Sequence, residues 1–285
     1  MKPIAFTKMH GIGNDYIYID CFGGLPADPG RLAQEMSPRH FSVGADGVVL
    51  ICPSDCADAR MRMFNADGSE GKMCGNAIRC VGKYLYDHGI CQKKELDIET
   101  ASGIKHLTLF TESKRVTRVS VDMGYADFTP QNIPVLTDKP AVDLPVEVAG
   151  KTYFLTCVSM GNPHAVTFLD GVEDLDLPRI GPLFESHPLF PERVNTEFVR
   201  VIDRRCVQMR VWERGSGETY ACGTGACATV AAGVKKGILD AGVPVCVRLI
   251  GGELSIVCTE DFHITMCGGA KKVYEGVYED EDSAE

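Results

Sequence analysis

Residues Met73-Cys74-Gly75-Asn76, with the helix-like sequence that continues to Asp87, decide how this chain is organised. A cysteine placed directly before a glycine and a helix start faces the free N–H groups and the partial positive charge of the helix N-terminus. The same arrangement returns 148 positions later (222 − 74), at Ala221-Cys222-Gly223-Thr224. The repetition predicts two copies of one unit, each with a cysteine at the start of its main helix.

Other landmarks repeat at the same spacing: Gly13-Asn14 matches Gly161-Asn162, Glu70 matches Glu218, and Gly103 matches Gly251. Matches that keep one register are the signature of a duplicated unit. We therefore expect an α+β fold of two mixed α/β domains related by a pseudo-two-fold axis, at residues 1–122 and 123–269. Each domain has many short strands wrapped around a central helix, and the active site lies in the cleft between the domains.

Apolar spacing and the placement of glycine and proline predict the individual elements. Helices are expected at 31–36, 76–87, 180–186 and 224–236, with short strands in the same order in both halves. The stretch 124–145 is rich in proline and turn residues, so it is expected to form the crossover between the domains.

Composition excludes several classes of protein. The 285 residues are 45% apolar, and no apolar run approaches the roughly 20 residues of a membrane span. Because the N-terminus enters strand-like sequence directly, we expect the protein to stay in the cytoplasm, away from membranes. The formal net charge is −10, and six acids lie in the last eleven residues, so the tail is expected to be solvated. Without a basic stripe, a nucleic-acid partner is not expected.

The thirteen cysteines cannot all pair internally, and their spacings do not fit a structural zinc site. Most of them, for example Cys80, Cys157 and Cys246, lie in apolar sequence and are expected to be small buried hydrophobic residues. Only Cys74 and Cys222 lie among glycines and polar residues. No metal is expected at either.

A helix N-terminus lowers the pKa of a cysteine and offers amides to an anion, so each loop is expected to activate its own thiol and bind a carboxylate. Two acid/base groups on opposite faces of one carbon suit inversion of a stereocentre. No lysine or phosphate-binding loop suggests pyridoxal phosphate, so no cofactor is expected. The alternative is that Cys74 and Cys222 are ordinary buried cysteines that precede small-residue helices.

At these residues the sequence resembles the diaminopimelate epimerase family, over nearly the whole chain. The segments that carry the resemblance are Lys8–Asp15, Arg39-His40-Phe41, Gly44–Gly47, Met61–Glu70, Met73–Asn76, Met160–His164, Asn195–Val199, Trp212–Gly215 and Glu218–Gly225. It implies interconversion of LL- and meso-2,6-diaminopimelate in lysine and peptidoglycan precursor synthesis, by a homodimer acting on a small molecule. It also implies that a C-terminal strand, about 270–285, completes the first domain.

The resemblance implies roles for individual residues. Cys74 and Cys222 match the two catalytic cysteines, and His164 and Glu213 match positions that tune them. The implied substrate-binding residues are Asn14, Gly47, Asn65, Gly75, Asn76, Asn162, Asn195, Glu213, Arg214, Gly223 and Thr224. Among these, Arg214 matches the group that holds the distal carboxylate. Glu70 and Glu218 are expected to support the loops and are left out of the site.

Each role has a plainer alternative. An asparagine beside glycine is often a turn residue, His164 could satisfy a strand end, and Glu213-Arg214 could be a solvated pair. The chain also departs from the family pattern, with Gly47 where many members carry Gln, and with Ser42 and Ala77 where glycine is usual. These departures bear on fine specificity rather than on the reaction.

Two other functions compete with the epimerase. One is another cofactor-independent racemase of the same fold, such as a proline racemase. A substrate without a distal charge would leave Arg214 buried without a carboxylate, which is costly. The other is a thiol redox or metal-binding protein, which would use a disulfide or zinc in its working state.

Overall fold

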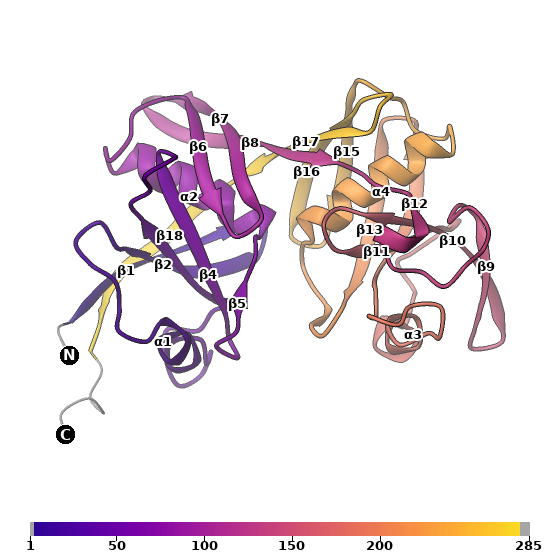
Figure 1. The fold of residues 1–285 in the computed structure, drawn as a ribbon, viewed down its shortest axis with the longest axis horizontal. Helices are drawn as coiled ribbons and strands as arrows, with labels where there is room; N and C mark the ends of the chain where they lie inside the picture. Colours follow the sequence, from indigo (N-terminus) through magenta and orange to yellow (C-terminus); the bar gives the residue numbers. More distant parts are fainter. Residues whose placement is uncertain (1–2, 280–285) are drawn as a thin grey trace. The chain divides into compact units, whose positions relative to one another are not determined.

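The computed structural model describes residues 3–279 and divides the chain into two compact units. Unit 1 comprises Met1–Val121 and Gly268–Glu285, and unit 2 comprises Asp122–Cys267. Each unit is a mixed sheet with two α-helices, so the predicted two-domain α+β class is confirmed (Figure 1). The acidic residues from position 280 onward lie outside the described residues.

Unit 1 contains eleven elements: β1 (Ile4–Gly11), β2 (Asn14–Asp20), α1 (Pro29–Met36), β3 (Gly47–Cys52), β4 (Ala59–Asn65), β5 (Glu70–Gly71), α2 (Gly75–Asp87), β6 (Glu95–Thr100), β7 (Gly103–Glu112), β8 (Arg115–Tyr125) and β18 (Lys271–Tyr278). Strand β8 ends just beyond the unit boundary. Strand β18 pairs antiparallel with β1, and the sheet continues through β2, β3, β4, β6, β7 and β8. The β2–β3 and β4–β6 pairs are parallel.

Unit 2 contains η1 (Pro130–Asn132), β9 (Leu144–Val148), β10 (Lys151–Ser159), β11 (Pro163–Phe168), α3 (Leu177–Glu185), β12 (Asn195–Asp203), β13 (Cys206–Glu213), β14 (Gly217–Glu218), α4 (Gly223–Lys235), β15 (Pro244–Leu249), β16 (Gly252–Cys258) and β17 (His263–Gly269). Its sheet runs from β9 through β10, β11, β12, β13, β15 and β16 to β17. Counted along each sheet from β18 and from β9, the parallel pairs are the third and fifth in both units, and in unit 2 they are β11–β12 and β13–β15.

The long helix of each unit is buried on most of its surface because strands surround it. Ten of the thirteen residues of α2 are buried, and α2 packs against β1, β2 and β7 (Figure 1). Gly82 makes this packing close, since a Cβ there would lie 2.9 Å from a methyl carbon of Leu107. The helix α4 is buried to the same extent, against β10, β11, β12 and β16. The central helix holds each cysteine at a fixed point of its unit.

The shorter helices cover another part of each sheet. Asp28 caps α1 by accepting from the Arg31 N–H at 3.0 Å, and Pro29 occupies its first turn. Leu32, Ala33 and Met36 of α1 are buried in a cluster with apolar residues of β2 and β3. In unit 2, α3 packs in the same manner against β12 and β13.

The register of the two units agrees from the second strand to the central helix and then shifts by one. Ile17 pairs with Val48 in unit 1, and Ala165 pairs with Thr196, 148 positions later, in unit 2. After α4, however, the hairpin glycine equivalent to Gly103 is Gly252, because Thr100 pairs with Gly103 and Leu249 with Gly252. The match of Gly103 to Gly251 was therefore wrong, because unit 2 has one extra residue between α4 and this hairpin.

Two connections add detail to the predicted organisation. The stretch 124–145, expected to be the crossover between the domains, contains η1 and the first residues of β9, a strand that was not predicted. Strands β1 and β2 are joined by a turn of only two residues, Ile12-Gly13, with φ of 50° and 91°. Such a turn keeps strand pairing intact up to Gly11 and Asn14, which fixes Asn14 at a strand end.

Candidate active site

In unit 1, Cys74 is the N-cap residue of α2, with an extended backbone (φ −135°, ψ 120°). Its half-buried thiol donates to Oδ1 of Asn14 at 3.3 Å, so the sulfur does not cap its own helix. The N–H groups at the start of α2 stay directed toward the site in front of the helix. This is the arrangement that the sequence predicts for a carboxylate-binding helix start.

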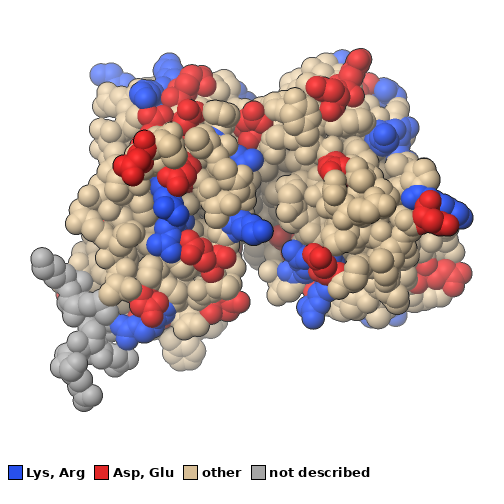
Figure 2. Space-filling model, in the orientation of Figure 1, with Lys and Arg blue, Asp and Glu red and all other residues tan. Residues whose placement is uncertain are grey.

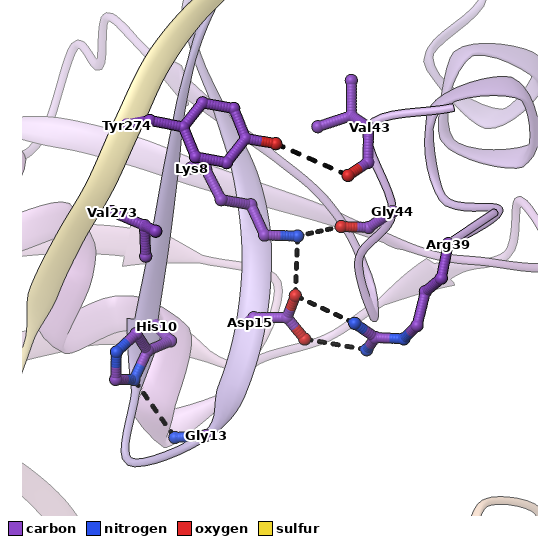
Figure 3. A pocket seen from close by; sticks show the side chains of 9 residues that line it. All are labelled: Lys8, His10, Gly13, Asp15, Arg39, Val43, Gly44, Val273 and Tyr274. Carbon is purple, nitrogen blue, oxygen red and sulfur yellow. Dashed lines mark hydrogen bonds and ion pairs between the residues drawn. The ribbon is translucent and has the colours of Figure 1, made fainter. Parts of the chain in front are cut away.

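Asn14 is held in place by a network of charged residues. Its Nδ2 donates to Asp46 Oδ2 at 2.7 Å, and because a carboxylate only accepts, Oδ1 of Asn14 must face Cys74. Arg39 donates to Asp46 at 2.7 Å. It also donates to both oxygens of Asp15 at 2.8 and 3.1 Å, and Lys8 pairs with Asp15 at 2.6 Å (Figure 3). The network fixes the side chain that meets the Cys74 thiol.

The carboxyl groups of this network differ in pKa. Burial opposes ionisation of Asp15, but hydrogen bonds from Arg39 and Lys8 outweigh it and hold its pKa below the ordinary value. Burial and the neighbouring charge of Asp15 raise the pKa of Asp46. One negative charge is thus firmly retained, while the residue that orients Asn14 holds its charge less tightly.

A surface pocket of about 460 Å³ lies beside this network in unit 1. Figure 3 shows the Lys8, Asp15 and Arg39 side chains converging on one another within it, with Tyr274 of β18 across from Val43. Cys74 does not line this pocket, and the charges in it are already paired. We therefore do not assign the pocket to the chemistry of the thiol.

The remaining predicted residues of unit 1 lie around the same strand ends. Gly47 pairs with Asn65, and a Cβ at Gly47 would lie 2.1 Å from the Phe64 carbonyl oxygen, so the observed backbone leaves no room for a side chain there. Nδ2 of Asn65 donates to Ser69 Oγ at 3.0 Å. Asn76 is buried in the first turn of α2, with its Oδ1 bound to Arg79. Only the backbone of Gly47 is available to a ligand.

Arg79 is a buried cation that the sequence did not single out. It is fully buried, and its guanidinium donates to the Gly75 carbonyl at 3.1 Å and to Asn76 Oδ1 at 2.9 Å. Gly11 allows this close approach, since a Cβ there would lie 2.9 Å from Nη2 of Arg79. The positive charge lies within the first turns of α2 and adds to that of the helix N-terminus.

In unit 2, Cys222 is the N-cap residue of α4, again with an extended backbone (φ −116°, ψ 110°). Its sulfur accepts from the Gly225 N–H at 3.4 Å and lies 3.6 Å from the hydroxyl of Thr224. Burial raises the pKa of this thiol well above its ordinary value, and the charges of Glu213 and Glu197 add to the effect. The expectation that the helix start lowers this pKa was wrong for Cys222, because desolvation and two carboxylates outweigh the hydrogen bonds.

A chain of polar contacts leads from Cys222 to a buried acid. Asn162 Nδ2 donates to Thr224 Oγ1 at 3.4 Å, and Asn162 Oδ1 lies 3.0 Å from His164 Nε2. Nδ1 of His164 lies 2.7 Å from Oε1 of Glu197, and both side chains are fully buried. His164 therefore reaches the thiol through Asn162 and Thr224.

The other predicted residues of unit 2 are placed by the ends of β12 and β13. Asn195 donates to the Pro163 carbonyl at 2.8 Å and accepts from the Arg214 N–H at 2.9 Å. The Arg214 side chain is exposed, with Nη1 donating to the Glu192 carbonyl at 2.8 Å. The expected burial of Arg214 was wrong, so a burial cost cannot decide between substrates. Glu213 accepts from the Thr219 hydroxyl.

Glu70 and Glu218 each support the turn before a cysteine, as expected. Arg62 donates to both oxygens of Glu70 at 2.7 and 2.9 Å, and Arg210 does the same to Glu218 at 2.7 and 3.0 Å. The two pairs again lie 148 positions apart. They tie β5 to β4 and β14 to β13, where each chain turns toward its central helix.

Sequence reasoning also missed Glu197 and Asp46 as members of the site. The available signal was an acid inside an apolar strand, Asn195–Val199, and an acid between the small residues Ala45 and Gly47. An ionisable residue in such sequence is buried only with a partner, so its partner marks a polar cluster.

Three further observations concern the cysteines, the potential metal ligands and the helices of the described residues. None of the thirteen cysteines, all of which lie within residues 3–279, forms a disulfide. Within residues 3–279, no group of three or more His, Cys, Asp or Glu side chains is arranged to hold a metal ion. In the same range, none of the helices has the length and apolar character required to cross a membrane. Acidic and basic side chains are interspersed on the visible face of each unit (Figure 2).

Comparison with solved structures defines the class of fold. The chain is similar to a Bacillus anthracis phenazine biosynthesis protein of the PhzF family (TM-score 0.71, 18% identity, 98% of this chain and 100% of that one). It is also similar to a probable proline racemase from Agrobacterium radiobacter (TM-score 0.75, 18% identity, 99% and 94%). At this identity the likeness establishes the two-unit fold and not the substrate.

Comparison of sequences is more specific. The family model described as diaminopimelate epimerase matches residues 6–129 and 156–273. Diaminopimelate epimerase from Desulfovibrio desulfuricans is 56% identical over 283 residues, covering 96% of this chain and 98% of that protein. The Acetivibrio thermocellus protein of the same name is 53% identical over 275 residues, covering 96% and 98%. The chain belongs to the diaminopimelate epimerase family, as its sequence motifs predict.

Proposed function

We propose that this protein interconverts LL- and meso-2,6-diaminopimelate, as an isomerase in lysine and peptidoglycan precursor synthesis. The observation that carries the proposal is the pair of N-cap cysteines, Cys74 and Cys222, at equivalent places in two equivalent units. The family membership supplies the substrate. Names of relatives that are 46–56% identical over nearly the whole chain support the same reaction.

The proposed reaction inverts one α-carbon with two thiols. One sulfur, as thiolate, removes the α-proton, and the other, as thiol, delivers a proton to the opposite face, so the pair exchanges protonation states in each turnover. The mechanism requires Cys74 and Cys222 to reach opposite faces of the same carbon. Both are N-cap residues, so their Cβ atoms are fixed by helices that are themselves buried.

The carbanion formed at the α-carbon needs stabilisation of the adjacent carboxylate. The N–H groups of Gly75 and Asn76 at α2, and of Gly223 and Thr224 at α4, are unused by the helices themselves. We assign the reacting carboxylate to these donors, because helix N-termini favour anions and fixed donors stabilise developing negative charge. No cofactor enters the proposal.

Substrate recognition is assigned to polar side chains at the strand ends. We propose that Asn14, Asn65, Asn162 and Asn195 contact the substrate, and that Glu213 binds its amine. Arg214 is proposed to hold the distal carboxylate; its guanidinium is exposed and anchored by one hydrogen bond, which leaves donors for a second partner. We further propose that the working form is a cytoplasmic homodimer.

The decisive experiment is incubation of the reduced protein with LL-diaminopimelate in D2O, followed by NMR and chiral chromatography. We expect one deuterium at one α-carbon and formation of the meso isomer. Proline in place of diaminopimelate is the control for the racemase alternative. Failure to exchange the α-hydrogen of diaminopimelate under reducing conditions contradicts the proposal, and exchange of proline alone favours the alternative.

A further inference from the structure

Glu197 is the most deeply buried acid of unit 2 whose role the reaction above leaves open. It lies on β12 with no exposed surface, against His164 of the neighbouring strand β11. Its Oε1 is shared with the histidine, and its Oε2 is buried without a hydrogen-bond partner among the described residues. A buried carboxylate with one unpartnered oxygen is costly, so the group calls for a physical explanation.

The carboxyl group also lies directly beneath the start of α4. A Cβ on Gly225 would lie 2.6 Å from Oε1 of Glu197 and 3.2 Å from the sulfur of Cys222. The acid and the thiol therefore flank the same glycine. Any larger residue at 225 would push apart the helix start and the acid.

A chain of hydrogen bonds links Glu197 to Cys222 through His164, Asn162 and Thr224, and its donors and acceptors can be arranged in only two consistent ways. In the observed one, Nδ2 of Asn162 donates to Thr224, so Oδ1 of Asn162 accepts from Nε2 of His164. Nε2 must then carry a proton. Thr224 Oγ1 accepts from Asn162 and keeps its own hydrogen for the sulfur of Cys222, 3.6 Å away.

A protonated Nε2 constrains the other side of the imidazole. One further proton must lie between Nδ1 of His164 and Oε1 of Glu197, either as carboxylic acid and neutral imidazole or as carboxylate and imidazolium. The pair is neutral in both forms. If the pair loses one proton, the imidazole keeps a single proton on Nδ1, which donates to the Glu197 carboxylate. Nε2 then carries no hydrogen and becomes an acceptor.

Loss of the proton would reverse every later step. Asn162 would turn its amide to donate to Nε2, its Oδ1 would face Thr224, and the hydroxyl would donate to Asn162 instead of to the sulfur. Cys222 would then keep only the Gly225 N–H as a donor. The protonation state of Glu197 is in this way coupled, through His164, Asn162 and Thr224, to the stabilisation of a thiolate at Cys222.

We propose that Glu197 is a positioning residue for Cys222. By sharing one proton with His164, it keeps Nε2 a donor, sets the direction of the Asn162 amide, and aims the Thr224 hydroxyl at the sulfur. The inference rests on the proposed function for its kinetic consequence, but its structural content concerns the protonation of His164 and is independent of any substrate.

Electrostatics support this assignment. Burial raises the pKa of Glu197 to about 7, an effect that the His164 charge opposes and the Glu213 charge reinforces. The other titratable groups that face the acid are Cys157 of β10, whose pKa burial and Glu197 raise to about 12, and Cys222 itself. With these neighbours the shared proton is retained at acidic pH and is released in the neutral range.

The first test is 15N NMR of the whole protein labelled in its histidine rings, with His164 assigned by its loss in His164→Gln. We expect Nε2 of His164 to be protonated at pH 6 and to lose that proton as the pH rises through the titration of Glu197. In Glu197→Gln, whose amide can donate to Nδ1, Nε2 is expected to stay protonated from pH 6 to pH 9. A bare Nε2 at pH 6 in the wild-type protein overturns the proposal.

The second test is kinetic. Glu197→Leu is expected to lower α-deuterium exchange by roughly 10- to 100-fold, the size found when a hydrogen-bond partner that orients a metal-bound histidine is removed. Glu197→Gln is expected to retain activity and to lose the inflection near neutral pH. Glu147→Gln, which removes an exposed charge from β9, is the matched control and is expected to match the wild type. Equal pH profiles for the wild type and Glu197→Gln overturn the proposal.

The two failures are distinguishable. If the wild-type protein exchanges no diaminopimelate, the proposed function fails while the NMR result still decides the role of Glu197. If the wild-type protein is active but His164 and the pH profile do not respond to Glu197→Gln, only the present inference fails. Should Glu197→Leu not fold, the wild type and Glu197→Gln suffice.

Discussion

The two cysteine sites have the same backbone and opposite surroundings. Cys74 donates its thiol hydrogen to a side-chain carbonyl and lies at the start of a helix that contains the buried cation Arg79. Cys222 accepts from a peptide N–H and lies near two carboxylates. Duplication thus preserved the helix that presents the thiol, while the residues that set its protonation diverged.

Three pairs of equivalent positions produce the difference. Tyr16 stands where unit 2 has His164, and Val49 stands where it has Glu197; both unit 1 residues are buried. Arg79 stands where unit 2 has Cys227. In the proposed reaction each thiol acts on its own face of the α-carbon, one removing a proton while the other delivers one, so the two sites need not be symmetric.

The largest expected effect comes from removing either thiol. Cys74→Ser and Cys222→Ser are each expected to lower epimerisation by roughly 10²- to 10⁴-fold, because a serine hydroxyl is a far weaker acid/base group in this role. Chiral chromatography of product measures the loss. Cys91→Ser and Cys206→Ser, which change half-buried thiols elsewhere, are the controls. Substantial turnover by either N-cap variant contradicts the two-thiol mechanism.

A smaller effect is expected from replacing Asp46, because this residue orients Asn14, the partner of Cys74, and has no such role for Cys222. Asp46→Ala removes a charged hydrogen bond from Asn14, worth about 2 kcal/mol, or roughly 30-fold in rate if the orientation is lost entirely. In Asp46→Ala, the pH dependence of the reaction of the Cys74 thiol with iodoacetamide, followed by peptide mass spectrometry, should shift. Cys222 should keep its wild-type profile. A parallel shift at both cysteines argues for a general loss of structure instead.

The pH dependence of stability is expected to differ between the units. The pKa of Glu197 is raised from 4.5 to about 7, so its contribution to stability is fully present below pH 4.5 and is lost as the pH rises through 7. Unit 1 has Val49 at this place and lacks the effect. Amide hydrogen exchange at pH 5 and pH 8, corrected for the intrinsic rate, should show a loss of protection in unit 2 that Glu197→Gln abolishes. Protection that rises with pH only in unit 2 contradicts this assignment.

The smallest expected effect distinguishes the turn between β1 and β2 in unit 1 from the matching turn between β10 and β11 in unit 2. Ile12 has φ of 50°, a conformation that disfavours a β-branched residue, whereas Gly161 takes the positive φ at the matching turn of unit 2. Ile12→Asn is expected to raise the free energy of unfolding by about 0.5–1 kcal/mol, measured by urea denaturation. Met160→Asn relieves no such strain and loses burial, so it is expected to destabilise. A loss of stability in Ile12→Asn contradicts the assigned strain.

Sequence reasoning found what depends on local pattern. The helices after Cys74 and Cys222 were predicted from the spacing of apolar and small residues along the chain and from the glycine at each helix start. The duplicated register was then found from the common spacing of 148 residues. The β9 strand was missed because Pro145 lies inside it, at an exposed position where strand proline is tolerated.

Properties that depend on three-dimensional neighbours could not be predicted. The helix N-terminus is local and suggests an acidic thiol, but the raised pKa of Cys222 comes from burial and from acids on β12 and β13. The exposure of Arg214 is likewise decided by the turn that follows β13. The roles of Glu197 and Asp46 appear only when the strands that carry their partners are placed beside them.

The pairing of β18 with β1 has a consequence for synthesis of the chain. In unit 2 the equivalent outer strand, β9, immediately precedes β10 and joins it through the tight turn Ala149-Gly150. In unit 1 that place is filled by residues 271–278, which are translated after the strands of unit 2. Unit 2 can therefore acquire all its strands while the N-terminal edge of unit 1 is still open. Strand β1 precedes all the other described strands in the sequence, yet this edge of it is covered only by the one that follows all the others, so a chain that ends at residue 270 leaves β1 without this partner.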